Sequence, residues 1–236
     1  MTTTPAPEDL AGLIDHTVLK PDTDEATVLR VIAEAVEHRL AAVCINPKWV
    51  ALTAAQLKNT SVKTCTVVGF PLGATTTAQK VAEAREAVEA GAQEVDMVVD
   101  IADANAGAAE AVTAQIAAVA AVTHAGGALL KVILETALLG QRAKELVCRA
   151  ALDAEADFVK TSTGFAGGGA TADDIELMHS VVGGRLGIKA SGGVRSYQDA
   201  LTLVRAGATR IGASSSLDIV GAGQAGSAAD SSSENY

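Results

Sequence analysis

Short apolar runs alternate along the chain with longer segments of helical periodicity. The apolar runs are rich in Val, Ile and Leu and rarely alternate with polar residues, as expected for strands that are covered on both faces. We predict strands at Gly12–Ile14, Ala41–Cys44, Thr64–Val68, Glu94–Val99, Leu129–Leu134, Asp157–Val159, Gly187–Ile188 and Thr209–Gly212.

The segments between these strands carry helix signals. Apolar residues repeat at helical spacing in two sets: Val28, Ile32 and Ala35, and Val112, Ile116 and Val119. Pairs spaced like capping boxes precede apolar runs: Asp22 with Glu25, Thr171 with Asp174, and Ser196 with Asp199. Glycines fit helix ends in Ala90-Gly91-Ala92 and Ala206-Gly207-Ala208, each just before a strand.

Eight strands that alternate with helices predict a parallel sheet closed into a (β/α)8 TIM barrel. An open doubly wound sheet is the alternative, but no G-x-G-x-x-G sequence follows the first strand. The length of 236 residues and the 49% hydrophobic content suit a single barrel domain, which we place at residues 1–217. Residues 218–236 are rich in Gly, Ala and Ser, and we expect them to form a flexible C-terminal tail.

The formal net charge of −10 argues against nucleic acid or an anionic membrane as a partner. It also means that an anionic substrate would need local positive groups at its site. No apolar run near the start resembles a signal peptide, and no run is long enough for a membrane span. Three cysteines without metal-like spacing fit free thiols, so we expect a cytoplasmic protein.

Charged or small polar residues stand where the predicted strands end. They are Asp15, Cys44, Gly69, Asp96 with Asp100, Glu135, Lys160, Lys189 and Ser214. The active sites of (β/α)8 barrels lie at the carboxyl ends of the strands, and unpaired charges buried there would cost several kcal/mol each. A ring of such residues therefore predicts an active site.

Lys160 and Lys189 follow consecutive predicted strands, which lie about 4.8 Å apart in a sheet. Repulsion between the two ammonium groups would lower one lysine pKa and leave an amine able to attack a carbonyl. The alternative is that both lysines point outward into solvent. Asp96, inside an apolar strand, is the expected counter-ion, and its alternative role is a structural salt bridge.

Glycines after the last three strands predict a phosphate-binding region, because they let backbone N–H groups approach an anion. The segments are Gly164, Gly167-Gly168-Gly169, Gly192-Gly193-Val194-Arg195 and Gly212-Ala213-Ser214-Ser215. We expect no metal and no cofactor, because the four histidines (His16, His38, His124 and His179) form no ligand-like spacing with Cys or Asp. Cys44 as a nucleophile would need a histidine base, for which His16 is the candidate.

Several segments, taken together and in order, resemble the deoxyribose-phosphate aldolase family. They run from Leu13 to Ser215 and are Leu13-Ile14-Asp15-His16-Thr17, Val43-Cys44-Ile45-Asn46-Pro47, Val67-Val68-Gly69-Phe70-Pro71-Leu72-Gly73, Glu94-Val95-Asp96-Met97-Val98, Leu130-Lys131-Val132-Ile133-Leu134-Glu135-Thr136, Phe158-Val159-Lys160-Thr161-Ser162-Thr163-Gly164 and Ile188-Lys189-Ala190-Ser191-Gly192-Gly193-Val194-Arg195. The resemblance implies an enzyme, a lyase without cofactor. It would reversibly cleave 2-deoxy-D-ribose 5-phosphate to D-glyceraldehyde 3-phosphate and acetaldehyde in deoxyribonucleotide catabolism.

The same resemblance implies roles for individual residues. Lys160 would form the Schiff base, Lys189 would lower its pKa, and Asp96 would transfer protons through a water molecule. The implied substrate-binding residues are Asp15, Thr17, Cys44, Thr163, Gly164, Gly192, Gly193, Ser214, Ser215 and the C-terminal Tyr236. The resemblance also implies a homodimer.

The chain departs from some relatives at Phe165, where they carry a lysine directly after Ser-Thr-Gly. Phosphate would then depend more on backbone N–H groups and on Arg195. Two rival functions are another phosphosugar aldolase with the same lysine chemistry and a catalytically silent sugar-phosphate binding protein.

Overall fold

A closed parallel barrel forms the centre of the protein. The computed structural model describes residues 5–221. In that part of the chain the strands pair in sequence order, and the last one pairs with the first. They are β1 (Ile14–Val18), β2 (Ala42–Ile45), β3 (Lys63–Val68), β4 (Glu94–Val98), β5 (Leu129–Ile133), β6 (Phe158–Lys160), β7 (Gly187–Ser191) and β8 (Arg210–Ala213). The predicted TIM barrel is confirmed, and the open sheet is excluded.

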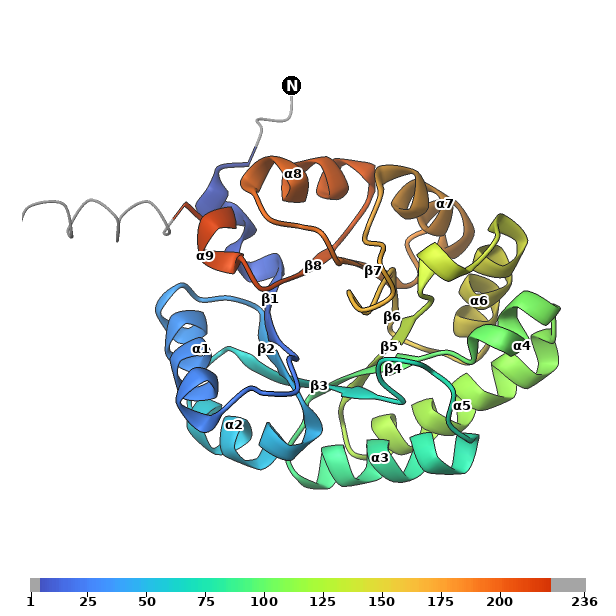
Figure 1. Cartoon of the computed structure of the whole chain (residues 1–236), viewed down its shortest axis with the longest axis horizontal. Coiled ribbons are helices and arrows are strands. Elements are labelled where there is room, and N and C mark those ends of the chain that lie inside the picture. The colour runs from blue at the N-terminus through green and yellow to red at the C-terminus, as the bar shows by residue number, and fades with distance from the viewer. Residues whose placement is uncertain (1–4, 222–236) are drawn as a thin grey trace, which may run out of the picture.

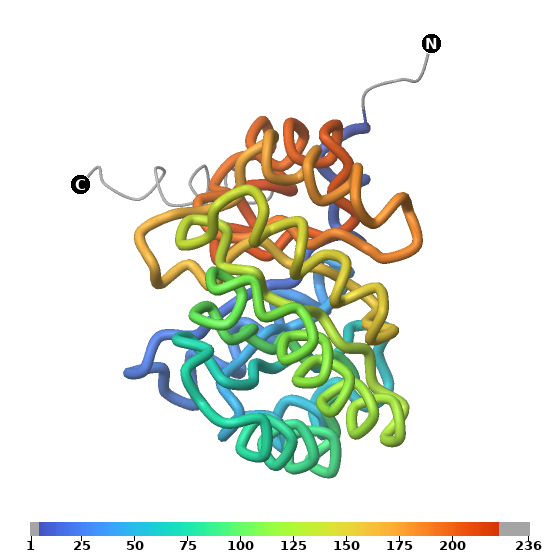
Figure 2. The backbone as a smooth tube through the Cα atoms, turned by 90° about the vertical axis from the view of Figure 1, so that its right-hand side faces the viewer, coloured from blue at the N-terminus to red at the C-terminus, as the bar shows by residue number. Residues whose placement is uncertain are grey.

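Helices form a ring around the strands (Figure 1). They are α1 (Glu25–Glu37), α2 (Val50–Leu57), α3 (Thr77–Glu89), α4 (Ile101–Ala106), α5 (Ala109–Ala125), α6 (Gln141–Asp153), α7 (Ala172–Val182), α8 (Tyr197–Ala206) and α9 (Ser216–Ile219). Three short 3-10 helices join them, η1 (Pro7–Leu13), η2 (Pro47–Trp49) and η3 (Thr136–Leu138). Both views place η1 beside α8 and α9, where the Tyr197 hydroxyl donates to the Pro5 carbonyl (Figures 1 and 2).

Alternate residues of each strand face two different surroundings, as the pleat requires. Ile14, Val43 and Ile188 belong to a large apolar core between the strands and the helices. Cys44, Cys65 and neighbouring apolar residues form a second, smaller cluster of buried side chains. A strand in this barrel can therefore present apolar residues to the helices and reactive or charged residues to the interior of the barrel.

The first strand lies later in the chain than predicted. The prediction placed it at Gly12–Ile14, but Gly12 and Leu13 belong to η1, and β1 begins at Ile14. The apolar run of Leu13 and Ile14 resembled a strand, although it includes the end of the 3-10 helix that precedes β1. Asp15 consequently lies within the strand and not after it.

Two other strands continue through charges at which the prediction ended them. β6 includes Lys160, and β7 runs from Gly187 to Ser191, so that Lys189 is its central residue. The prediction treated a buried lysine as the end of a strand, because unpaired charges are costly to bury. Here carboxylates inside the barrel pair with both lysines, so the strands can pass through them.

Helix starts and ends agree with the predictions at most positions. Thr171 and Ser196 cap α7 and α8, with side chains that accept from the backbone N–H groups of Asp174 and Asp199. Gly207 ends α8 in the left-handed conformation, as predicted. The predicted Asp22 cap is wrong, because Asp24 accepts from the Thr27 N–H group and begins α1.

The predicted domain boundary at residue 217 falls within α9. Most of the predicted tail, residues 222–236 with Tyr236 among them, lies outside the described residues. Among the residues that the structure describes, no helix combines the length and apolar character needed to cross a membrane.

The cap of α8 yields a stability prediction. Ser196→Ala should lower the free energy of unfolding by about 1 kcal/mol, because the N–H group of Asp199 loses its acceptor. Ser180→Ala is the matched control, since the exposed Ser180 hydroxyl donates to Leu177 and caps no helix start. Urea unfolding measures both variants, and equal midpoints for the two would contradict the assignment of the cap.

Candidate active site

Asp96 is the centre of a buried charge cluster inside the barrel. This β4 carboxylate accepts hydrogen bonds from three amines: Lys131 Nζ at 2.8 Å, Lys160 Nζ at 2.8 Å and Lys189 Nζ at 2.7 Å. Register explains the meeting, because Asp96 is opposite Lys131 on β5, and Lys160 is opposite Lys189 on the next strand pair. Both predicted lysines therefore point inward, and the alternative of outward lysines is excluded.

A second group of charges lies against the same lysines. Lys189 Nζ is 2.5 Å from Asp15 Oδ2, and Lys131 Nζ is 2.6 Å from Glu94 Oε2. Arg210, the first residue of β8, donates to Asp15 Oδ1 at 2.7 Å and to Glu94 Oε2 at 2.9 Å. The cluster thus joins three carboxylates and four cations, contributed by β1 and β4 through β8.

The pKa values in the cluster follow from burial opposed by pairing. Burial by itself would raise the pKa of Asp15, but Lys189, Lys131 and Arg210 outweigh it and lower that pKa to about 2. The same balance holds the pKa of Asp96 well below its usual range. Burial would lower the pKa of Lys131 and Lys189, whereas the surrounding carboxylates raise both. These groups are therefore ionised together near neutral pH.

Gly212 provides the space that Lys189 occupies. A Cβ atom at this β8 position would lie 3.0 Å from Lys189 Cε and 3.0 Å from Ser191 Cβ. Such contacts are tighter than ordinary van der Waals packing, so a side chain here would displace the lysine stem.

Two buried thiols lie beside the cluster. Cys44 on β2 is opposite Cys65 on β3, and Cys65 Sγ lies 3.3 Å from both Asp96 Oδ1 and Lys131 Nζ. Burial, with the nearby Cys44 and Asp96, raises the pKa of Cys65 well above its usual value. The atoms of Cys44, Cys65 and Asp96 are close enough together to bind a metal ion, as are those of Asp15, Cys65 and Glu94. In both groups, however, ammonium or guanidinium groups already contact the carboxylates.

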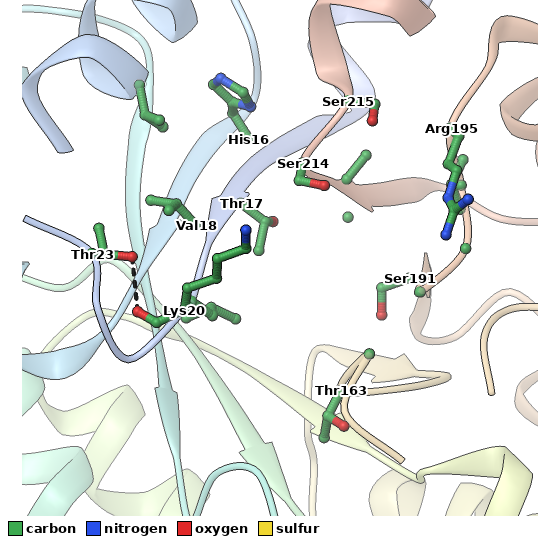
Figure 3. Close-up of a pocket in the computed structure, with 18 of the residues that line it drawn as sticks. His16, Thr17, Val18, Lys20, Thr23, Thr163, Ser191, Arg195, Ser214 and Ser215 are labelled. Atoms are coloured by element: carbon green, nitrogen blue, oxygen red, sulfur yellow. Dashed lines mark hydrogen bonds between the residues drawn. The ribbon is translucent and has the colours of Figure 1, made fainter. Parts of the chain in front are cut away.

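A cavity of about 850 Å³ opens above the cluster, at the carboxyl ends of the strands. Within the described part of the chain, Lys160 is the one member of the cluster that lines it. Seven of the predicted substrate-binding residues also line it: Thr17, Thr163, Gly164, Gly192, Gly193, Ser214 and Ser215. Figure 3 shows the side chains of Thr17, Thr163, Ser214 and Ser215 around a common space. Asp15 and Cys44, both fully buried, are not among the lining residues.

Glycines allow the loops after β6 and β7 to pack closely at the edge of the cavity. Gly164, Gly192 and Gly193 have φ of 86°, 84° and 78°, a conformation that other residues rarely adopt. A Cβ atom at Gly169 would lie 2.3 Å from the Gly192 carbonyl oxygen. The Ala170 N–H group donates to the same oxygen at 3.0 Å, so the two loops are joined directly.

Glu135 and an aromatic pair hold the loop after β6 in place. The Thr163 hydroxyl donates to Glu135, and the Phe165 N–H group donates to the Thr163 hydroxyl oxygen at 3.1 Å. Phe165 meets Phe70, from the loop after β3, edge to face at a ring-centre distance of 5.3 Å. Glu135 therefore positions the loop and does not join the charge cluster.

Other residues singled out in the sequence lie away from the cluster. Asp100 caps α4, His124 binds Asp157, and His179 lies on α7. His16 lines the cavity and binds Glu34 at 2.8 Å. His38 ends α1.

Sequence reasoning missed four residues in or beside the charge cluster, Lys131, Glu94, Arg210 and Cys65, and it missed Lys20, which lines the cavity. Lys131 carried a usable signal, because a single lysine between Leu130 and Val132 interrupts an otherwise apolar strand. The alternation of side chains along a strand would also have indicated Lys131, because this residue is opposite Asp96 on the neighbouring strand. Lys20 and Arg210 gave no comparable signal, because each stands at the edge of an apolar run where exposed cations are common.

A (β/α)8 barrel with buried lysines and carboxylates beneath a loop-lined cavity has the arrangement of a barrel enzyme. Residues 10–226 match the profile of the DeoC/LacD family aldolases. The chain is 55% identical over 227 residues to a deoxyribose-phosphate aldolase of Micrococcus luteus, covering 94% of this chain and 99% of the relative. The chain therefore belongs to the DeoC/LacD aldolase family.

Solved structures agree with this assignment. A putative deoxyribose-phosphate aldolase from Coccidioides immitis superimposes with a TM-score of 0.90 at 37% identity, covering 94% of this chain and 88% of that one. A deoxyribose phosphate aldolase from Aeropyrum pernix, described as a unique tetramer, gives 0.86 at 34% identity, covering 93% and 92%.

The cluster generates a prediction about Lys131. Lys131→Met should lower the free energy of unfolding at neutral pH by about 3 kcal/mol or more, because it removes one partner from buried ion pairs with Glu94 and Asp96. Lys63→Met, at an exposed position of β3, should change it by less than about 0.5 kcal/mol. Urea unfolding compares them, and similar losses for both variants would contradict the energetic role of Lys131.

The low pKa of Asp15 yields a pH prediction. Its pKa is about 2 in the folded protein and 3.8 for an ordinary aspartate, so the folded state favours the ionised form. The resulting stabilisation is complete above the ordinary value and is lost as the pH falls toward 2. The contribution of Asp15 to the unfolding free energy should be nearly the same at about pH 6 and 4.5 and should be smaller at about pH 3.

Two aspartate variants test that explanation. Asp15→Asn should show a smaller decrease than the unaltered protein, whereas Asp173→Asn, an exposed position on α7, should show the same decrease. An unchanged slope in Asp15→Asn would assign the acid sensitivity to other carboxylates.

Proposed function

We propose that this aldolase reversibly cleaves 2-deoxy-D-ribose 5-phosphate to D-glyceraldehyde 3-phosphate and acetaldehyde through a Schiff base on Lys160. The observation that carries the proposal is the position of Lys160. Its amine is part of the buried cluster, yet it lines the cavity, whereas Lys131 and Lys189 do not. A substrate aldehyde in the cavity would therefore meet Lys160 first.

Charge balance also favours Lys160 as the nucleophile. With every group ionised, the cluster holds four cations and three carboxylates. Loss of one proton would equalise the charges. Among the described residues, Lys131 contacts three carboxylates and Lys189 contacts two, whereas Lys160 contacts only Asp96. Lys160 is the cation whose neutral form would sacrifice the fewest ion pairs.

Lys189 and Asp96, which lie in the buried cluster beneath the cavity, would assist proton transfer to and from Lys160. Asp96 Oδ2 accepts from both Lys160 and Lys189, so one oxygen joins the two amines. A proton that leaves Lys160 then has a short path toward the cluster. The predicted electrostatic effect of Lys189 on Lys160 is part of this proposal.

The bond-breaking sequence starts with attack of the neutral Lys160 amine on the C1 aldehyde of the open-chain sugar. Loss of water gives an iminium ion, which can accept an electron pair. Asp96, through a water molecule, takes the proton of the C3 hydroxyl. The C2–C3 bond breaks, its electrons form an enamine, and glyceraldehyde 3-phosphate leaves.

The second half of the reaction regenerates the enzyme. The enamine carbon takes up a proton, and water adds to the resulting iminium ion. Acetaldehyde then leaves, and the Lys160 amine is free. Proton transfer by a positioned side chain typically contributes about 100- to 10,000-fold to such steps.

The loops around the cavity fit the substrate's phosphate. Backbone N–H groups near Gly164, Gly192 and Gly193, with the hydroxyls of Ser214 and Ser215, border one cavity. We assign these residues and Thr17 to substrate binding, with Asp15 acting through Lys189. The proposal also includes a cytoplasmic location, a catabolic role and a homodimer, although the Aeropyrum pernix relative is described as a tetramer.

Borohydride reduction in the presence of deoxyribose 5-phosphate, followed by peptide mass mapping, tests the mechanism. Reduction should trap the substrate-derived adduct on Lys160, because the iminium forms there. Lys160→Leu should lose activity and trapping together, whereas Lys58→Met, an exposed position, should keep both.

Each other result identifies a different explanation. An adduct on Lys189 would keep the reaction class and exchange the roles of the two lysines. Binding of the sugar phosphate without any adduct would favour the silent binding protein. Preferential cleavage of a ketose phosphate would favour another phosphosugar aldolase.

A further inference from the structure

Four lysines and arginines line the cavity, and two of them are committed to carboxylates. Arg30 donates to Glu34 at 2.6 Å, and Lys160 donates to Asp96 at 2.8 Å. Within residues 5–221, neither Lys20 nor Arg195 forms an ion pair with a carboxylate within 4.0 Å. These two are therefore the side-chain cations available to an anionic ligand.

The loop after β1 fixes the backbone of Lys20. Its carbonyl oxygen accepts from the Thr23 hydroxyl at 2.8 Å, from the Thr23 N–H group at 3.2 Å and from Asn46 Nδ2 at 3.2 Å. Pro21 follows and restricts the backbone further. Figure 3 shows the Lys20 amine directed into the cavity, which Ser214 and Arg195 border on other sides.

A second cation at this cavity would match the charge of a sugar phosphate more closely than one cation would. A sugar phosphate carries about −1.5 to −2 charges at neutral pH, and one guanidinium supplies +1. The chain carries −10 overall, and the exposed Asp22 and Asp218 also line the cavity. Salt screens charges beyond about 8 Å, so cations at the cavity itself decide whether a dianion is held.

We propose that Lys20 is a second phosphate ligand, which binds the substrate's phosphate from the β1 side while Arg195 and the glycine loops bind it from the other. This assignment rests on the proposed function for the identity of the sugar, and on the cavity geometry for the anion. Lys20 thereby determines the preference of the enzyme for phosphorylated over unphosphorylated sugars.

The test compares Lys20→Met, Lys20→Arg and the control Lys58→Met, whose exposed lysine does not line the cavity. The measured quantity is kcat/KM for 2-deoxyribose 5-phosphate divided by kcat/KM for 2-deoxyribose. This ratio should fall about tenfold in Lys20→Met, equivalent to ~1.4 kcal/mol. It should stay within about threefold of the unaltered value in Lys20→Arg, and should not change in Lys58→Met.

A binding measurement separates this inference from the proposed reaction. Calorimetry with inorganic phosphate should show about tenfold weaker binding to Lys20→Met than to Lys58→Met, whether or not the protein cleaves deoxyribose phosphate. Equal phosphate affinities in these two variants would overturn the role of Lys20. Equal losses for both sugars would also overturn it, because Lys20 would then act on the sugar and not on the phosphate.

Discussion

The structure depends on one carboxylate that pairs with three lysines inside a closed barrel. Burial would raise the pKa of Asp96 and lower those of Lys131 and Lys189, and the pairing of these charges outweighs it. Each strand from β4 to β7 contributes one of these four residues, with Asp96 opposite Lys131 and with Lys160 opposite Lys189 two residues further along the strands. The barrel interior is therefore organised around charge pairing, and apolar packing is left mainly to the outer faces of the strands.

This arrangement gives the three lysines different surroundings although they share one partner. Lys131 lies between Glu94 and Asp96, and Lys189 lies between Asp15 and Asp96. Lys160 has a single ion-pair partner in the part of the chain that the structure describes, and it borders the open cavity. The amines of Lys131 and Lys189 thus remain cations that contribute to the electrostatic potential inside the barrel, while the Lys160 amine is placed where a substrate carbonyl can reach it. The division of roles follows from position in the barrel, because the side-chain chemistry is identical.

The sequence was sufficient for the barrel and for the central residues of the site, since apolar strands that contain Asp96, Lys160 and Lys189 are rare without a reason. It was less informative about where strands begin and end. The predicted first strand included Gly12 and Leu13, which belong to a 3-10 helix, and β7 was ended before Lys189 because a charge was taken as the end of a strand. Arg210 and Lys20 could not be recognised from sequence, because their importance depends on which residues face them across the barrel or the cavity.

The two faces of each strand also have different roles, because one packs against the helices and the other faces the interior of the barrel. Residues such as Val43 and Ile188 hold the helices against the outside of the barrel, whereas their neighbours Cys44 and Lys189 face inward. The loop residues that line the cavity, such as Thr163, Gly192 and Ser214, belong neither to this outer packing nor to the charge pairs inside the barrel. Substitutions among them can therefore change the substrate while a chain of this kind keeps the same packing between helices and strands.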